Sequence, residues 1–202
     1  MRISIHTTLL YTALAAVLGS CSPKNISSKY YYENEKVLDR IEESYKELNN
    51  LAPFTIGFTD RSFSTLSLEI ITDTLSYIYE FNLDDPGLAD TLSKYHPKPA
   101  KVLNLVTLMQ SIRCTWIRSL DYYVDEKKNS LIFMSIKPVA LKAPLSYHKY
   151  YVLTYYQQPQ YFDEEGMLLD NKRTVRRLRK INGEVFRKIN DKVCYTISGN
   201  FR

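Results

Sequence analysis

His96 and His148 are the side chains in the body of the chain that are best suited to transfer protons near neutral pH. His96 lies between Tyr95 and Pro97, and His148 lies in a tyrosine-rich stretch. The chain contains no serine in a nucleophile-elbow motif and no HExxH or other close spacing of metal ligands. We therefore interpret both histidines as partly exposed loop residues. We predict no catalytic residue, no metal and no cofactor, so an enzyme is the less favoured class of protein.

Three consecutive carboxylates precede a glycine in the segment Asp163-Glu164-Glu165-Gly166. Calcium takes oxygen ligands, but this segment lacks the alternating ligand positions and the closing glutamate of an EF-hand loop. Consecutive acidic side chains mostly point apart and stay hydrated, so we predict a solvated turn. Paired carboxylates of the glycosidase kind depend on separation in space, which the sequence leaves open.

The densest cluster of positive charge lies near the C-terminus. On neighbouring strands such side chains can bind the phosphate or carboxylate groups of a lipid, a cell-wall polymer or an acidic partner. The alternative is an exposed strand face whose charges discourage edge-to-edge aggregation. The candidate anion- or partner-binding residues are Lys172, Arg173, Arg176, Arg177, Arg179 and Lys180, followed by Arg187, Lys188 and Lys192.

Tyrosine is unusually frequent, with 17 residues against 6 glycines. Because successive side chains of a strand point to opposite faces, the pairs Tyr122-Tyr123, Tyr150-Tyr151 and Tyr155-Tyr156 place one ring on each face. One ring of a pair can then enter the core while the other stays outside. Exposed rings in a row would form a platform for a glycan or a protein, whereas the favoured interpretation is that tyrosine fills half-buried strand positions.

The first 20 residues have the layout of a secretory signal peptide. They contain one strong base, Arg2, no acidic residue, and an apolar run over residues 9–18 that ends in small residues. A run of about ten residues is too short to cross a bilayer, which takes roughly 20. We therefore expect a cleaved leader and no permanent transmembrane helix.

The end of this leader, Leu18-Gly19-Ser20-Cys21, resembles a lipobox, the sequence at which bacterial lipoprotein precursors are acylated and cleaved. The resemblance implies diacylation of the Cys21 thiol, cleavage just before it, and acylation of the new amino group. The alternative is ordinary cleavage nearby, with Cys21 a plain thiol. Each buried methylene contributes about 0.8 kcal/mol, so several acyl chains make a stable anchor. Ser22, and not aspartate, follows the cysteine, which by enterobacterial sorting implies the outer membrane. Surface-exported lipoproteins of the Bacteroidota type tend to carry acidic residues just after the cysteine. Residues 22–25 carry no acidic residue, which favours a domain that faces the periplasm.

Lipidation of Cys21 leaves Cys114 and Cys194 in a compartment where disulfides persist. They form a possible disulfide, which would close a loop of about 80 residues. Two separately buried thiols are the alternative. Removal of the leader lowers the formal net charge from +5 to +4, a mild excess that suits anionic surfaces. Export separates the chain from cytoplasmic nucleic acid, so we predict no nucleic-acid partner.

These candidate residues must be positioned by helices and antiparallel strands. Residues 22–32, with a proline and several serines, predict a short tether. Residues 33–50 carry apolar side chains at three- and four-residue steps and predict an amphipathic helix. Further helices are expected at 88–95 and 99–111. An apolar period of two predicts strands over residues 54–59, 66–70, 75–81, 114–124, 131–136 and 150–157, of which 66–70 and 75–81 form a hairpin.

The C-terminal part predicts a three-stranded meander over residues 176–181, 184–189 and 192–198. Asn182-Gly183 and Asn190-Asp191 separate these segments with residues that tolerate the positive φ of two-residue loops. The predicted fold class is α+β, a mostly antiparallel sheet with one or two packing helices in a single domain over residues 33–202.

The sequence thus predicts an envelope lipoprotein, held at the membrane by its lipid anchor, that binds a protein or an envelope polymer as a non-enzymatic accessory or assembly component. Two alternatives stay open. One is an envelope hydrolase with dispersed catalytic residues, His96 or His148 and a carboxylate among them. The other is a small-ligand or toxin-binding module, such as a periplasmic immunity factor.

Overall fold

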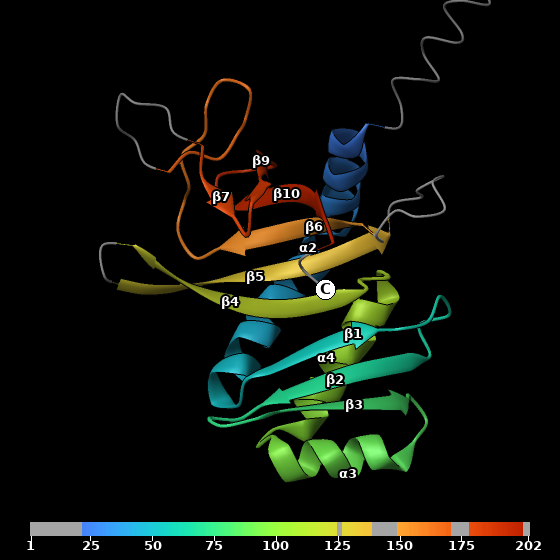
Figure 1. Ribbon diagram of the computed structural model, residues 1–202. Helices are drawn as coiled ribbons and strands as arrows, with labels where there is room; N and C mark the ends of the chain where they lie inside the picture. The colour runs from blue at the N-terminus through green and yellow to red at the C-terminus, as the bar shows by residue number, and fades with distance from the viewer. Residues whose placement is uncertain (1–21, 125–126, 139–148, 171–177, 200–202) are drawn as a thin grey trace, which may run out of the picture.

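An antiparallel sheet of eight strands forms the centre of the computed structural model, which describes residues 22–124, 127–138, 149–170 and 178–199 (Figure 1). The strand order is β3-β2-β1-β4-β5-β6-β10-β9, and β7 and β8 form a separate two-stranded sheet. The predicted α+β class, with a mostly antiparallel sheet in a single domain, is confirmed. The strands are β1 Phe54–Phe58, β2 Thr65–Ile71, β3 Ser76–Asn82, β4 Trp116–Val124, β5 Lys127–Pro138, β6 Tyr150–Tyr156, β7 Lys180–Ile181, β8 Glu184–Val185, β9 Arg187–Lys188 and β10 Val193–Ser198.

The helices in the described ranges are α2 Pro23–Leu51, α3 Pro86–Tyr95 and α4 Pro99–Ser111. Each begins with a proline in its first turn, where the missing backbone N–H costs nothing because that donor has no intrahelical acceptor. The predicted helices at 88–95 and 99–111 are confirmed, and so is the predicted hairpin, in which β2 and β3 pair with Leu68 opposite Tyr79.

The first helix, α2, begins ten residues earlier than the sequence predicts. Ser22 is its N-cap, and its hydroxyl accepts a hydrogen bond from a backbone N–H of the first turn. Tyr31 is only 3% exposed, and the Tyr30 hydroxyl donates to the carbonyl of Ile112 at 2.8 Å. Residues 22–32 are therefore not the tether that the sequence predicts. Their serine and proline start a helix, and their tyrosines pack on the domain.

Glu47, near the end of α2, ties this helix to the start of α4. Its carboxylate lies 2.7 Å from Nζ of Lys98 and 3.0 Å from Nζ of Lys101. Hydrogen bonds from Lys98 and Lys101 lower the pKa of Glu47 to about 2. The pair is exposed, so it orients the two helices more than it stabilises them.

The two faces of the sheet carry separate apolar clusters. On one face Leu38 of α2 and Leu105 of α4 pack in a cluster that includes Ile117 of β4. On the other face Phe133 of β5 packs against Phe186, which belongs to the chain that follows β6. Burying a leucine or phenylalanine contributes about 1.5–3 kcal/mol, so both clusters hold the sheet in place.

The C-terminal strands depart from the predicted meander. Asn182 and Gly183 have φ of 50° and 81°, the positive values that a two-residue loop requires, and β7 and β8 pair across them. The predicted strand 184–189, however, is divided at Phe186, whose ring is fully buried. As a result β8 stays with β7, and β9 pairs with β10 at the edge of the main sheet.

Candidate functional site: the outer edge of β3

His96, the first candidate for proton transfer, is a buried structural residue. It is 4% exposed, and its ring packs edge-on against Phe54 with centroids 5.5 Å apart. Nδ1 accepts a hydrogen bond from the backbone N–H of Lys98 at 3.0 Å, so Nε2 carries the proton and donates to the carbonyl of Leu48 at 3.2 Å. The expectation of a partly exposed residue is wrong here. The ring is buried because one nitrogen bonds to Leu48 of α2 and the other bonds to Lys98 in the α3–α4 junction. His148 lies outside the described residues.

The acidic segment Asp163-Glu164-Glu165-Gly166 forms a turn, as predicted. Oδ1 of Asp163 accepts hydrogen bonds from the backbone N–H groups of Glu165 and Met167, and Gly166 takes a φ of 77°. The Asp163 side chain is thus occupied in holding the turn. In the described part of the chain no three or more His, Cys, Asp or Glu side chains gather so as to hold a metal ion.

Of the first six candidate basic residues the structure describes Arg179 and Lys180, and it also describes Arg187, Lys188 and Lys192. The guanidinium of Arg179 stacks over the ring of Tyr122 at 4.8 Å and donates to Oε1 of Gln160 at 3.2 Å. Arg179 therefore fastens the chain after β6 to the sheet, while Lys180 is exposed on β7. Lys172, Arg173, Arg176 and Arg177 lie outside the described residues, so their role in anion binding stays a prediction.

Cys114 and Cys194 are both free and fully buried. The Cys114 thiol belongs to the cluster under the helices and donates to the carbonyl of Ser135, whereas Cys194 belongs to the cluster on the opposite face. The possible disulfide is therefore wrong, because the sheet separates the two thiols, and the alternative of two separately buried thiols is confirmed. Burial raises the pKa of each thiol to about 12.

The tyrosine pairs of β6 are buried on both faces. Tyr151 and Tyr155 lie in the cluster under the helices, and Tyr150 and Tyr156 lie in the opposite cluster. The expectation that one ring of each pair stays outside is wrong for β6, because this strand is covered on both sides. These rings therefore fill the core and form no binding platform.

Four of the eight large hydrophobic side chains that are exposed among the described residues lie on the hairpin of β2 and β3. Ile78 is 73% exposed and Leu75 58%, and Ile71 and Tyr77 are also exposed. β3 is the outermost strand, and among the described residues no strand pairs with its outer side, beside which helix α3 runs (Figure 1). We call this outer side of β3, with Ile78 at its centre, the β3 edge. An exposed apolar edge is a place where another strand can add.

The hydrogen-bond ladder fixes which backbone groups of the β3 edge are available. The backbone N–H of Thr72 donates to the carbonyl of Leu75, and the backbone N–H of Leu83 donates to the carbonyl of Ser64, both at 2.9 Å. Hydrogen-bonded pairs alternate along an antiparallel ladder, so Tyr77, Tyr79 and Phe81 bond to β2. The N–H and C=O groups of the residues between them, Ser76, Ile78 and Glu80, therefore point outward.

Helix α3 runs alongside β3 and presents Tyr95 to it (Figure 1). The Tyr95 ring stacks on Tyr77 with centroids 5.9 Å apart, and the Tyr79 hydroxyl donates to the Tyr95 oxygen at 3.1 Å. This hydrogen bond raises the pKa of Tyr79 and lowers that of Tyr95, which accepts the proton. The rings of Tyr77, Tyr79 and Tyr95 thus form a fixed apolar surface between β3 and α3.

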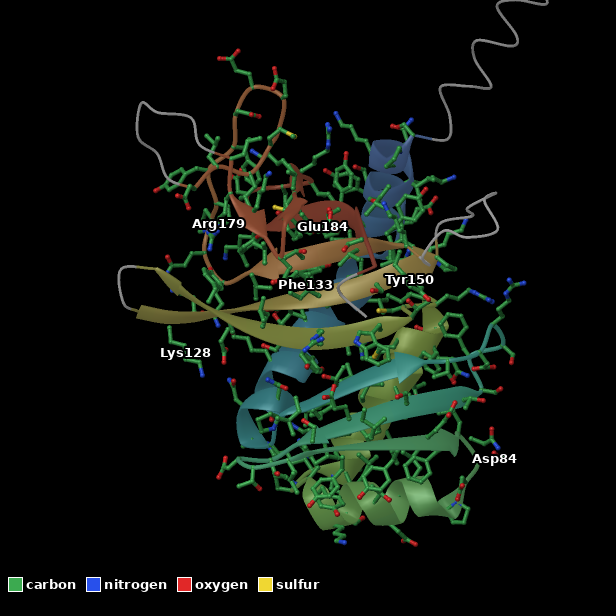
Figure 2. All side chains as sticks on the ribbon, in the orientation of Figure 1. Asp84, Lys128, Phe133, Tyr150, Arg179 and Glu184 are labelled. Atoms are coloured by element: carbon green, nitrogen blue, oxygen red, sulfur yellow. The ribbon has the colours of Figure 1, made fainter. Side chains whose placement is uncertain are left out.

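The chain around the β3 edge is acidic, although the whole protein carries a net charge of +5. Residues 60–95 contain seven acidic and two basic side chains. Glu69 lies opposite Ile78 in the ladder, and Glu80 lies on β3 itself. Figure 2 shows Asp84 at this end of the molecule and Arg179 at the opposite end. The excess of acidic side chains around the β3 edge gives it a negative local field.

The start of α2 lies at the other end, beside β9 and β10 (Figure 1). An open hollow of about 390 Å³ lies there, lined by Ser22, Lys24 and Arg187 among others. Its two cations are close to the residue that follows Cys21 in the sequence.

Comparison of the chain with protein-family models, with curated proteins and with solved structures found no significant match. None of the helices in the described ranges combines the length and the apolarity that crossing a membrane requires.

Proposed function

We propose that this protein is an envelope lipoprotein, anchored through acyl chains on Cys21, that acts as a non-enzymatic binding or assembly component. Its place is the outer membrane, with the domain facing the periplasm. The partner is a protein or an envelope polymer. The lipobox resemblance supports the anchor, and the exposed β3 edge supports the binding role.

The observation that carries the proposal is that the start of α2 and the β3 edge lie at opposite ends of the domain (Figure 1). Helix α2 has 29 residues, which at 1.5 Å per residue is about 44 Å. It runs from the β9–β10 end of the sheet toward β1 (Figure 1). A domain anchored at Cys21 would therefore hold the β3 edge away from the bilayer, where a partner can reach it.

The charge distribution supports the same orientation. Lys24 and Arg187 line the hollow beside the start of α2, and basic side chains near a bilayer are attracted to anionic headgroups. The acidic chain of residues 60–95 would be repelled by the same surface. Both effects favour a domain that stands on its basic end.

In the alternative of an envelope hydrolase, His96 is not available as a catalytic residue, because both of its ring nitrogens are bonded to the backbone. The toxin-binding alternative would share the β3 edge as its docking surface. Co-purification of a single small toxin with the protein would favour that alternative over an assembly role.

Metabolic labelling with an alkynyl palmitate analogue tests the anchor. We expect the full-length protein to be labelled and to fractionate with outer membranes, and Cys21→Ala to lose both the label and the membrane association. Cys194→Ala is the matched control, because its thiol is buried, and it should keep the label. Labelling that persists in Cys21→Ala would contradict the anchor.

A further inference from the structure

We infer that the β3 edge binds an extended, basic segment of a partner protein, which adds to the sheet as a ninth strand of the main sheet. The inference rests on the proposed binding function and names its partner class. It does not depend on the lipid anchor, so the two proposals fail in different experiments.

The backbone of β3 supplies the pairing groups. Ser76, Ile78 and Glu80 direct their N–H and C=O groups away from β2, at a spacing of two residues. Addition of a strand at a sheet edge draws its affinity from such main-chain hydrogen bonds and its specificity from alternate side chains. β3 has seven residues, which is long enough to pair with a short peptide segment.

The side chains on both faces of β3 favour a strand with apolar residues at alternate positions. We call the face of the sheet that packs on the helices the helix face and the opposite face the open face. On the open face, the Ile78 side chain is 73% exposed, and an aliphatic neighbour on an added strand would cover it. On the helix face, Tyr77 is exposed and is held by its stacking on Tyr95. A strand in this place would pack one set of side chains on Ile78 and the other set on the two rings.

The negative charge around the β3 edge favours a basic partner segment. Glu69 and Glu80 flank Ile78 on the open face, and residues 60–95 carry seven acidic against two basic side chains. Lysine or arginine on an added strand would lie near these carboxylates, and opposite charges on neighbouring strands attract. A second copy of the chain would instead place one acidic edge against another, which repels. The partner is therefore a basic segment and not a second β3.

The test uses full-length protein in detergent micelles and a labelled nine-residue peptide, capped at both ends, in which valines alternate with lysines and threonines. Fluorescence anisotropy should report saturable binding that weakens as salt rises. A peptide with glutamate in place of lysine, and one methylated on alternate backbone nitrogens, should each bind at least about tenfold more weakly. Equal binding of all three peptides would overturn the inference.

Two substitutions at one position separate the backbone from the side chain. Ile78→Pro removes an outward N–H and leaves the ladder to β2 intact, so it should weaken peptide binding by at least about tenfold. Ile78→Thr keeps that N–H and should lose less affinity. Because the methylated peptide probes the wild-type chain, the inference remains testable even if Ile78→Pro does not fold. Equal affinity of wild type and a folded Ile78→Pro would overturn it.

Size-exclusion chromatography with light scattering tests the competing occupant. A dimer of the wild type that Ile78→Pro converts to a monomer would assign the β3 edge to self-association and overturn the basic partner. A wild type that stays monomeric and binds the basic peptide supports the inference. Loss of acyl labelling would leave this result unchanged, whereas loss of peptide binding would leave the anchor unchanged.

Discussion

Replacing Gly57 with alanine should disturb the open face of the sheet at one identifiable contact. Gly57 lies on β1 opposite Trp116 of β4. A Cβ atom added at Gly57 would lie 1.6 Å from Cε3 and 2.3 Å from Cζ3 of Trp116. The indole ring therefore covers the glycine, and the substitution must push the ring off the strand.

The expected loss of stability follows from two opposing effects. Overpacking of a well-filled site costs about 1–3 kcal/mol. Alanine has less backbone freedom than glycine in the unfolded chain, which returns about 0.5–1 kcal/mol. The net destabilisation is about 0–2.5 kcal/mol, with a centre at about 1.2 kcal/mol. With a urea m value of about 2 kcal/mol/M, the unfolding midpoint should fall by about 0.6 M at the centre of this range and by about 1.3 M at most.

Trp116 is the single tryptophan of the chain, so its fluorescence reports on this contact directly. In native Gly57→Ala the emission should shift to longer wavelength, because the displaced ring enters water. Gly87→Ala is a control, since a Cβ there meets its nearest atom at 3.1 Å, and its effect should be small. In a Trp116→Leu background, followed by circular dichroism, Gly57→Ala should cost much less. An unchanged emission maximum, or the same cost with and without the ring, would refute the reasoning.

Three further outcomes are expected. In Cys21→Ala the two remaining thiols, Cys114 and Cys194, should react with Ellman's reagent at pH 8 only after urea unfolds the chain, because burial raises the pKa of each to about 12; fast reaction of the native protein would contradict their burial. For the same reason these two thiols ionise at lower pH in the unfolded chain than in the folded protein. As pH rises from 9 toward 12, the free energy of unfolding should therefore fall by up to about 1.4 kcal/mol per pH unit for each thiol. Equal urea midpoints at pH 7.5 and 10.5 would argue against this effect. Hydrogen bonds from two lysines lower the pKa of Glu47 to about 2, so Glu47→Gln should lower the urea midpoint at pH 7, progressively less between pH 4.5 and 2, and not below; the exposed Glu43→Gln on the same helix is the control, and an equal deficit at pH 7 and pH 2 would count against the ion pair.

The elements of the fold could be predicted where one periodicity repeats over several residues. The hairpin of β2 and β3 follows from apolar residues at every second position, and α4 follows from its apolar stripe and first-turn proline. The start of α2 was missed because a serine and a proline are common both in linkers and at helix starts. Only the packing of Tyr30 and Tyr31 on the domain distinguishes the two cases.

The candidate site could not be predicted, because it depends on the order of the strands. β1 pairs with both β2 and β4, and this pairing sends β3 to the outside of the sheet. The signal that the sequence did carry was Ile78, an apolar residue at a position of β3 that the two-residue period assigns to the polar face. The sequence left the choice between a disulfide and two separate thiols open for a related reason, because it does not state on which face of the sheet each thiol lies.

The central claim is that the protein is anchored at one end and binds a basic segment at the other. Photo-crosslinking in living cells tests it most directly, with benzoylphenylalanine in place of Ile78 or, as a control, in place of Tyr161, which is 49% exposed on the chain after β6. We expect a crosslinked partner at position 78 alone, and its crosslinked peptide should alternate apolar residues with lysine or arginine. The same adduct at both positions, or an acidic crosslinked segment, would contradict the account.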